Sequence, residues 1–412
     1  MRKIMACLDV GNYMIKLVVG EKLNDKLNVL AVSSVLTTGF KNGYIRDEEA
    51  FYICLKDVLD KNKEMLGMDI SSLYLSVGSH DACFSVNQGS LNIDEEKTIT
   101  GEEIIGVLQD SIVNQVEVNM ELVDVVPTSF KVDEDITANP KGKFGKELMV
   151  KSVISCVPKS RVDDIVQMLG RFNIDVLDIT FSTVGDYYAN KKDSYDDKIG
   201  VVINMGHENT TLSVFNKGVL TNTKVLELGG KNIDDDIAYA YKISLDDANK
   251  LKETYALAHT HSTNKNDYEI VTNNYGSEIK VNHHDLSSIV MERLSEVLNS
   301  IKNQINYLTK KEISYIIITG GLTECEDFSI LLKEKFGTKV DLGRINEIGA
   351  RDNMYSPAIG IINYYFYKMN LLEREYSIFD GVEQNDFSSA SRRRNIDGSS
   401  LLGKLFGYFF DN

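Results

Sequence analysis

The sequence predicts an α/β protein built from two copies of one unit, and three observations lead to this fold class. An apolar run over residues 4–10 ends in Asp9-Val10-Gly11-Asn12, and two further short apolar runs follow it. The same order returns about 195 residues later, where residues 199–205 end in Asn204-Met205-Gly206. A third apolar run, residues 315–319, opens into a pair of glycines. Strands that repeat with similar glycine turns are typical of a duplicated α/β fold.

Composition excludes several other classes of protein. The chain has 412 residues, of which 43% are apolar and 26% charged, so it is long enough for several domains and too apolar to be disordered. Its net charge of −16 argues against non-specific binding to nucleic acid. It has no stretch of about 18 apolar residues, and the apolar run near the N-terminus is too short for a signal peptide. We therefore expect a soluble cytosolic protein.

The five cysteines are scattered singly, with no CxxC pair. This spacing predicts small core residues in a reducing compartment rather than a metal site or a disulfide framework. They are Cys7, Cys54, Cys83, Cys156 and Cys325.

The first copy of the unit begins with three meandering strands, and helical spacing of apolar residues then runs over residues 50–65. The second copy has three strands as well, a tight hairpin turn at residues 216–218 and helical spacing over residues 233–241. After the third glycine signal, helical spacing resumes over residues 328–336. The expected strands span residues 4–10, 14–20 and 29–35 in the first copy, and 199–205, 212–215 and 223–228 in the second.

Two regions interrupt this pattern. Residues 84–160 contain strand-like runs such as residues 148–157, a helix over residues 102–115 and the prolines Pro127 and Pro140, which together predict an inserted subdomain. Residues 257–284 are rich in Asn, His and Thr and predict a polar hairpin or loop.

The C-terminal part of the chain changes character. Residues 373–398 are polar and contain the triplet Arg392-Arg393-Arg394, which predicts a flexible linker. Residues 399–412 follow with an apolar face at helical spacing, opposite Gly403, Lys404, Gly407 and Asp411. The apolar face consists of Leu401, Leu402, Leu405, Phe406, Phe409 and Phe410.

This terminal helix should form only where its apolar face is buried, because a helix of about a dozen residues is marginal in water. The upstream arginines favour anionic lipid by about 1 kcal/mol each. We therefore expect an interfacial membrane anchor. The alternative is a helix that docks on the core of the protein itself.

The glycine turns indicate a phosphate site. A glycine lets the backbone approach a phosphate closely, and successive N–H groups then act as donors. A carboxylate such as Asp9 can hold a hydrated Mg²⁺. Two such turns that face each other across a cleft would clasp the phosphates of a nucleotide, and a third Gly-Gly turn would cover the base. Each turn alone is a weak signal, and three in order form a stronger one.

These residues resemble the actin-like ATPase superfamily and, within it, the FtsA family of bacterial cell-division proteins. Residues 8–12 with Lys16 are similar to the first phosphate loop of the superfamily, and residues 204–210 to the second. Residues 319–321 resemble its adenosine loop, and residues 355–360 its closing segment. Pro127, Phe130, Val132-Asp133 and Asn139-Pro140 resemble the inserted subdomain that distinguishes FtsA from actin, sugar kinases and Hsp70 chaperones. The resemblance covers almost the whole chain.

The resemblance implies an actin-like, ribonuclease H-like fold of two lobes with an inserted α+β subdomain and a C-terminal amphipathic helix. It divides the chain into a first lobe core (1–83, 161–198 and 347–372), the inserted subdomain (84–160), a second lobe core (199–228 and 310–346), a further subdomain of that lobe (229–309), the linker (373–398) and the terminal helix (399–412).

The resemblance also implies the site. Mg²⁺ would be held through water by Asp9 and Asn204, and Arg293 would lie on the surface that binds a partner. The residues expected to bind ATP are Asp9, Gly11, Asn12, Tyr13, Lys16, Asn204, Gly206, Asn209, Thr210, Gly229, Gly230, Lys250, Glu253, Gly320, Gly321 and Leu322.

Three departures from the family pattern bear on catalysis. Asn204 stands where many relatives carry Asp, Ser182-Thr183 where relatives often have Glu followed by Pro, and Leu322 where a third glycine is common. An amide accepts a hydrogen bond from a metal-bound water but brings no negative charge to the ion. We therefore expect ATP binding to be preserved and hydrolysis to be weak or absent, with no catalytic residue assigned.

The function implied by the resemblance is an ATP-binding adaptor at the division site, on the cytoplasmic face of the bacterial plasma membrane. It would self-associate into filaments, attach to lipid through the terminal helix, act with other divisome proteins and tether the filaments of tubulin-like FtsZ by their tails. Two alternatives remain: a sugar or acetate kinase of the same fold, which would need a catalytic carboxylate near the γ-phosphate, and a pilus-assembly actin homologue, which lacks the anchor.

Overall fold

The computed structural model describes residues 3–23, 26–113 and 115–371. The segments expected to form the linker (373–398) and the amphipathic helix (399–412) lie outside these residues. Among the described residues, no helix has the length and apolar character needed to cross a bilayer.

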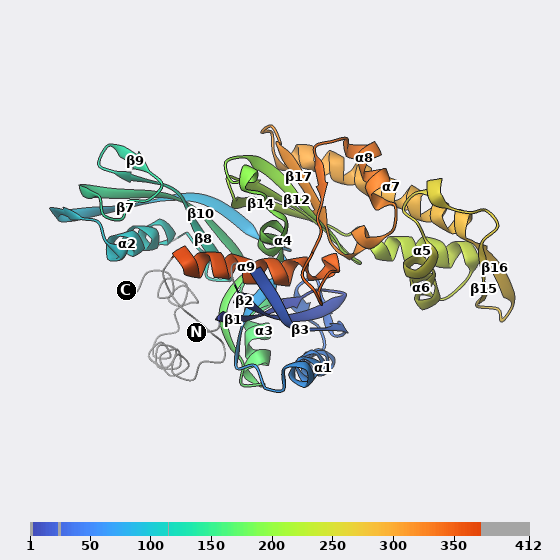
Figure 1. Ribbon diagram of the computed structural model, residues 1–412. Coiled ribbons are helices and arrows are strands. Elements are labelled where there is room, and N and C mark those ends of the chain that lie inside the picture. Colours follow the sequence, from blue (N-terminus) through green and yellow to red (C-terminus); the bar gives the residue numbers. More distant parts are fainter. Residues whose placement is uncertain (1–2, 24–25, 114, 372–412) are drawn as a thin grey trace.

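Two five-stranded sheets with the same topology form the two lobes (Figure 1). In each sheet the first three strands are antiparallel neighbours, and two later strands add in parallel beside the first of them. The duplicated α/β fold predicted from the sequence is therefore confirmed. The first sheet has the order β11 (Asp175–Phe181), β6 (Ser72–Val77), β1 (Lys3–Val10), β2 (Met14–Leu23), β3 (Lys26–Leu36). The second has the order β14 (Val219–Leu226), β13 (Thr210–Asn216), β12 (Ile199–Met205), β17 (Tyr315–Thr319), β18 (Val340–Leu342).

One expected strand is displaced. The third strand of the second lobe was expected over residues 223–228, whereas β14 begins at Val219. The cause is the hairpin turn at Lys217 and Gly218, whose φ angles of 52° and 76° are those of a two-residue turn that lets pairing start at once.

Helices cover the sheets and join the lobes. The first lobe carries α1 (Glu48–Leu66), which packs on β2 and β3, and α3 (Ser160–Gly170). The second lobe carries α5 (Gly230–Tyr241), α6 (Leu245–Tyr255), α7 (His283–Leu308) and α8 (Phe328–Phe336). One buried apolar core fills the first lobe and extends onto one face of the second sheet, and another fills the rest of the second lobe.

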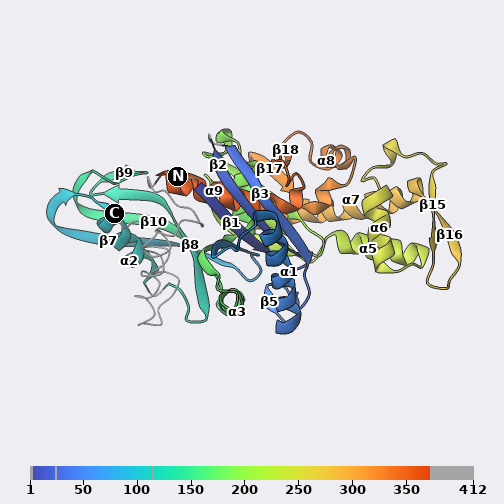
Figure 2. The ribbon, with the colours of Figure 1, turned by 60° about the horizontal axis from the view of Figure 1, so that its bottom comes forward.

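The inserted region forms a separate unit at one end of the molecule, and the hairpin of β15 (Tyr268–Thr272) and β16 (Glu278–Asn282) lies at the other (Figures 1 and 2). This hairpin confirms the one expected within residues 257–284. The inserted sheet has the order β7 (Cys83–Thr98), β10 (Phe144–Pro158), β8 (Met120–Val132), β9 (Asp135–Thr137). The helix α2 (Gly101–Ile112) packs on β7 and β10 over a third apolar core and ends three residues before the expected position.

The cysteine prediction was partly wrong. Cys7, Cys54 and Cys156 are buried, whereas Cys325 is partly exposed and Cys83 is exposed. Cys83 pairs directly with Cys156 in the register of β7 and β10, so two thiols that are distant in sequence lie side by side where the inserted sheet joins the first lobe.

Two helices cross between the lobes with their backbones in contact. The helix α4 (Ser182–Asn190) packs on β12, and α9 (Ser356–Leu371) packs on β1 and β2. A Cβ atom added to Gly360 would lie 1.7 Å from the carbonyl oxygen of Gly185, and one added to Gly185 would lie 2.0 Å from that of Pro357. The crossing therefore requires glycine at both positions.

We predict that Gly360→Ala lowers the free energy of unfolding by about 1–3 kcal/mol or more, because the methyl group forces the two helices apart. Gly170→Ala is the matched control, since a Cβ there meets nothing within 4 Å and alanine favours the end of α3. Urea denaturation of both variants measures the difference. Equal stability of the two variants would show that the crossing tolerates wider spacing.

Candidate functional site

A cavity of about 790 Å³ lies between the two lobes, within the size range of small-molecule sites. We call it the interlobe cleft. It brings together most of the expected ATP-binding residues from segments more than 300 residues apart: Asp9, Gly11, Asn12, Tyr13, Lys16, Asn204, Gly206, Asn209, Gly230, Glu253, Gly320, Gly321 and Leu322.

The first glycine loop is held by a backbone hydrogen bond of Gly11 and, beside it, by an ion pair between Asp9 and Lys16. The Gly11 N–H donates to the Met14 carbonyl oxygen at 3.1 Å, and a Cβ at Gly11 would lie 2.8 Å from that oxygen. Asp9 and Lys16 face each other in the register of β1 and β2, and Lys16 Nζ lies 2.7 Å from Asp9 Oδ2. Ser76 Oγ donates to Asp9 Oδ1 at 2.6 Å, so both carboxylate oxygens have partners.

The second glycine loop supports the start of α5. The Gly206 N–H donates to Asn209 O at 3.0 Å, and the Gly230 N–H donates to Gly206 O at 3.1 Å. Two residues that were expected to bind ATP do not face the cleft. Thr210 Oγ1 donates to the Leu228 carbonyl oxygen at 2.7 Å, and Gly229 packs so closely on the loop that a Cβ would lie 2.4 Å from the His207 carbonyl oxygen. Thr210 and Gly229 therefore shape the loop and do not line the cleft.

The two loops touch across the cleft. The ring of Tyr13 stacks on the imidazole of His207, with centroids 3.7 Å apart and planes 17° from parallel. His207 Nε2 also lies 3.1 Å from Asp234 Oδ2. The sequence indicated both loops, but no pattern along the chain indicated this contact, because it joins residues of different lobes.

The lysine of α6 that lines the cleft is Lys252, whereas the expected ligand Lys250 is not among the residues that line it. Lys250 is exposed, whereas Lys252 is buried and its Nζ lies 2.7 Å from Asp234 Oδ1. Two residues correspond to about 200° of rotation in an α-helix, so the two lysines take opposite faces. The helical spacing of the buried residues Ala248, Leu251 and Lys252 is the signal that could have separated them.

The adenosine loop packs against the second glycine loop. Gly320 has φ of 101°, and a Cβ there would lie 2.5 Å from Met205 O and 2.6 Å from Asn204 Oδ1. Only glycine fits this conformation and this space. Leu322 follows on the wall of the cleft.

Asn204 is tied to a buried acid that the sequence analysis missed. Its Nδ2 donates to Asp186 Oδ2 at 2.8 Å. Asp186 lies in α4, is 0% exposed, and burial raises the pKa of its carboxyl to about 7, although hydrogen bonds from Asn204 and Ser356 act in the opposite direction. An aspartate at position 204 would place two carboxylates together, so the Asn204 amide suits this neighbour. Asp186 lies within an ordinary helical pattern of apolar residues, which gives no sign of a functional side chain.

Ser182, the residue compared with the family pattern, begins α4 and lines the cleft.

Arg293 lies outside the cleft and is paired. Its Nε and Nη2 donate to the two carboxylate oxygens of Asp236 at 2.6 and 2.8 Å, and its Nη1 donates to Glu296 Oε2 at 2.8 Å. The bidentate pair joins α7 to α5 on a partly exposed surface.

Comparisons with known proteins agree with this geometry. A family model described as "Cell division protein FtsA" matches residues 201–360, and one described as "SHS2 domain inserted in FTSA" matches residues 79–155. Cell division protein FtsA of Bacillus subtilis is 25% identical over 368 residues, which cover 88% of this chain and 83% of that protein. FtsA of Escherichia coli is 25% identical over 382 residues, which cover 88% and 90%.

Solved structures show the same fold. A chain of the PilM–PilN type IV pilus biogenesis complex matches with a TM-score of 0.61 and 13% identity, over 87% of this chain and 97% of that one. MreB5 of Spiroplasma citri bound to ADP matches with a TM-score of 0.55 and 11% identity, over 90% and 97%. The fold and the cleft thus define an actin-like protein of two lobes. Since models specific to FtsA match both its second lobe and its inserted sheet, the chain belongs to the FtsA family of cell-division proteins.

The buried carboxyl of Asp186 predicts a pH dependence of stability. Because of its raised pKa, the Asp186 carboxyl stays protonated in the folded chain up to about pH 7, whereas an aspartate in the unfolded chain loses its proton near pH 4. Unfolding therefore releases a proton between these pH values, and the contribution of Asp186 to stability falls as the pH rises. Asp186→Asn keeps an acceptor oxygen for Asn204 and does not titrate.

The free energy of unfolding of Asp186→Asn, relative to the native chain, should therefore rise by on the order of 2 kcal/mol between pH 5 and pH 8. Urea titrations at several pH values measure this difference. A difference that does not change with pH would contradict the assignment.

Proposed function

We propose that this protein binds ATP with Mg²⁺ in the interlobe cleft, self-associates into filaments on the cytoplasmic face of the bacterial plasma membrane at the division site, and tethers FtsZ filaments there. The observation that carries the proposal is the convergence of two glycine loops, Lys16 and the Gly320-Gly321 turn on one cleft in a chain of the FtsA family.

The chemistry of the cleft supports a nucleotide that arrives with a cation. Lys16 and Lys252 supply positive charge, but each already pairs with a carboxylate. The acidic side chains on the cleft outnumber them: Asp9, Glu208, Glu253, Glu324, Glu326 and Asp352. A bare polyphosphate would be repelled by this excess, and Mg²⁺ would offset it. Asp9 would hold the hydrated ion.

Asn204 makes slow turnover the expected behaviour. Its amide brings no charge to the ion, and its Nδ2 is occupied by Asp186. Asp186 itself is fully buried and does not line the cleft, so it offers no base to an attacking water. ATP would thus act chiefly as a ligand that fixes the two lobes.

Two lysines on one helix test the nucleotide site. Lys252→Met should weaken binding of a fluorescent ATP analogue by about tenfold or more, because a charge at the phosphates is lost. Lys250→Met removes the same charge from the exposed face of α6 and should leave the affinity unchanged. A thermal unfolding curve for each variant checks folding. Equal affinities would place the nucleotide elsewhere.

Filament formation would strengthen a weak membrane anchor. Burial of six apolar side chains gains several kcal/mol at about 25 cal/mol per Å², while ordering about a dozen residues opposes this by about 1 kcal/mol or more per residue. One tail would therefore bind weakly and reversibly. A filament presents many tails to one surface, and the effective concentration multiplies weak sites into firm attachment.

Phe406→Glu should therefore abolish co-sedimentation with anionic vesicles and leave ATP binding intact, because it puts a charge on the apolar face. Gly407→Glu adds the same charge on the polar face and should retain most of the vesicle binding. Persistent co-sedimentation of Phe406→Glu would favour a tail docked on the protein itself.

The surface of residues 229–309, which includes Arg293, is the proposed docking site for the FtsZ tail. Its helices α5 and α7 are joined by the Arg293–Asp236 pair, so the arginine both stabilises the surface and presents charge at it.

The two alternatives differ from this proposal in measurable ways. A sugar or acetate kinase of this fold needs a carboxylate at the γ-phosphate, and neither Asn204 nor Ser182 supplies one. A pilus-assembly homologue shares the fold but would not need the terminal anchor. Sedimentation with ATP, with and without anionic vesicles, separates the candidates, and ATP turnover at the rate of a metabolic kinase, above about 1 per second, would overturn the proposal.

A further inference from the structure

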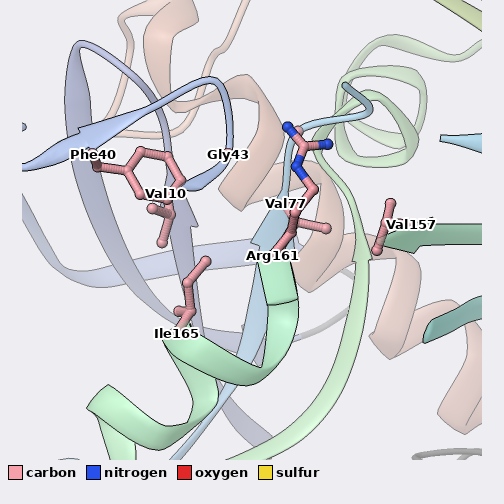
Figure 3. Close-up of a pocket in the computed structure, with 8 residues that line it drawn as sticks. Val10, Phe40, Gly43, Val77, Val157, Arg161 and Ile165 are labelled. Carbon is pink, nitrogen blue, oxygen red and sulfur yellow. The ribbon is translucent and has the colours of Figure 1, made fainter. Parts of the chain in front are cut away.

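The guanidinium of Arg161 is buried beside a small cavity (Figure 3), and the carboxylate of Asp81 lies close enough to act on it electrostatically. Arg161 lies at the start of α3 and is 3% exposed. Its Nη2 donates to the Asn42 carbonyl oxygen, and its guanidinium lies 5.0 Å from the ring of Tyr44. Nε and Nη1 have no hydrogen-bond partner among the described residues. A buried guanidinium with two unsatisfied N–H groups is unfavourable, so these groups indicate a missing partner.

A second unpartnered polar group lies in the loop that faces Arg161. His80, between β6 and β7, has a buried Nε2 with no hydrogen-bond partner among the described residues. Burial and the positive charge of Arg161 lower the pKa of His80 to about 4, while the charge of Asp81 acts in the opposite direction. The imidazole is therefore neutral at pH 7. An anion beside both groups would satisfy the guanidinium and favour the imidazolium.

The space beside Arg161 adjoins the interlobe cleft. A cavity of about 10 Å³ is lined by Arg161, Val157 and Ile165 and has room for one oxygen-sized group. It shares four lining residues with the cleft, Val10, Phe40, Gly43 and Gly78, while His80 lies on the cleft side. Gly43 has φ of 85°, and a Cβ there would lie 2.0 Å from Arg161 Nη2. At this position only the backbone of Gly43 separates the small cavity from the interlobe cleft.

We propose that Arg161 and His80 form a binding site for a phosphate-class oxyanion behind the floor of the interlobe cleft. One oxygen of the anion occupies the small cavity and accepts hydrogen bonds from Arg161 Nε and Nη1, and the rest of the anion lies on the cleft side near His80. The anion is either free inorganic phosphate or the terminal phosphate of a nucleotide in the cleft. The site does not depend on the proposed membrane or FtsZ functions, and free phosphate can fill it without nucleotide.

The alternative role for Arg161 is structural, since it ties the hairpin of residues 40–45 to α3 through Asn42 and Tyr44. The two roles predict opposite effects of Arg161→Met. If the charge awaits a ligand, the variant loses the response to phosphate and is at least as stable as the native chain in chloride, because an unpaired buried charge has been removed. If the charge only holds the hairpin, the variant is less stable.

Thermal unfolding of the full chain, without nucleotide, in sodium phosphate and in sodium chloride of equal ionic strength tests the proposal. We expect phosphate to raise the Tm of the native chain and Arg161→Met to weaken the apparent phosphate affinity about tenfold or more. Arg171→Met is the matched control, because it removes an exposed arginine from the other end of α3 and should keep the full response. If phosphate raises the Tm of the native chain and that of Arg161→Met equally, the proposal fails.

A second readout remains useful if Arg161→Met does not fold. NMR titration of His80 in the native chain should show its pKa rise when phosphate is added, whereas a structural arginine predicts no change. A non-hydrolysable ATP analogue, added in place of phosphate, distinguishes the sources: a shift with phosphate alone assigns the free anion, and a shift with the analogue alone assigns the terminal phosphate. No shift of the His80 pKa with either ligand would overturn the site.

Discussion

The close crossing of α4 and α9 is the constraint on which the geometry of the cleft depends. Their backbones meet at Gly185 and Gly360 without any intervening side chain. The start of α4 places Ser182 on the cleft, and the start of α9 places Pro357 there. Within the same crossing, Asn190 Nδ2 donates to Ser356 Oγ at 3.2 Å. A wider crossing would separate the two glycine loops, because α9 rests on the sheet of the first lobe and α4 on that of the second.

The sequence predicted the parts of this protein whose signals are local. Short β-branched strands, the glycine turns at Gly11 and Gly206 and the hairpin turn at Lys217-Gly218 are set by neighbouring residues, and all are found in the structure. The boundaries were less reliable, since β14 and α2 both depart from the expected ranges by a few residues.

Contacts through space were not predictable in the same way. Tyr13 meets His207, and Asn204 meets Asp186, only because two lobes and a connecting helix converge. The sequence singled out Lys250, whereas Lys252 lines the cleft, because the face that a helical residue takes depends on what packs against the helix. Cys83 and Cys156 look isolated in sequence and become neighbours through strand register.

Charge connects the body of the protein to its proposed anchor. The chain's net charge of −16 would repel it from an anionic bilayer, so the proposed attachment would need a segment that can lie apart from the folded lobes. A polar chain of the length of residues 373–398 has an end-to-end distance of roughly 28 Å, several times the Debye length of about 8 Å at physiological salt. At that separation the repulsion between body and lipid would be screened, while the three arginines next to the proposed anchor would be close enough to the lipid to be attracted. In the proposed arrangement, an acidic actin-like body and an apolar terminal segment that follows three arginines would be compatible because a long polar segment lies between them.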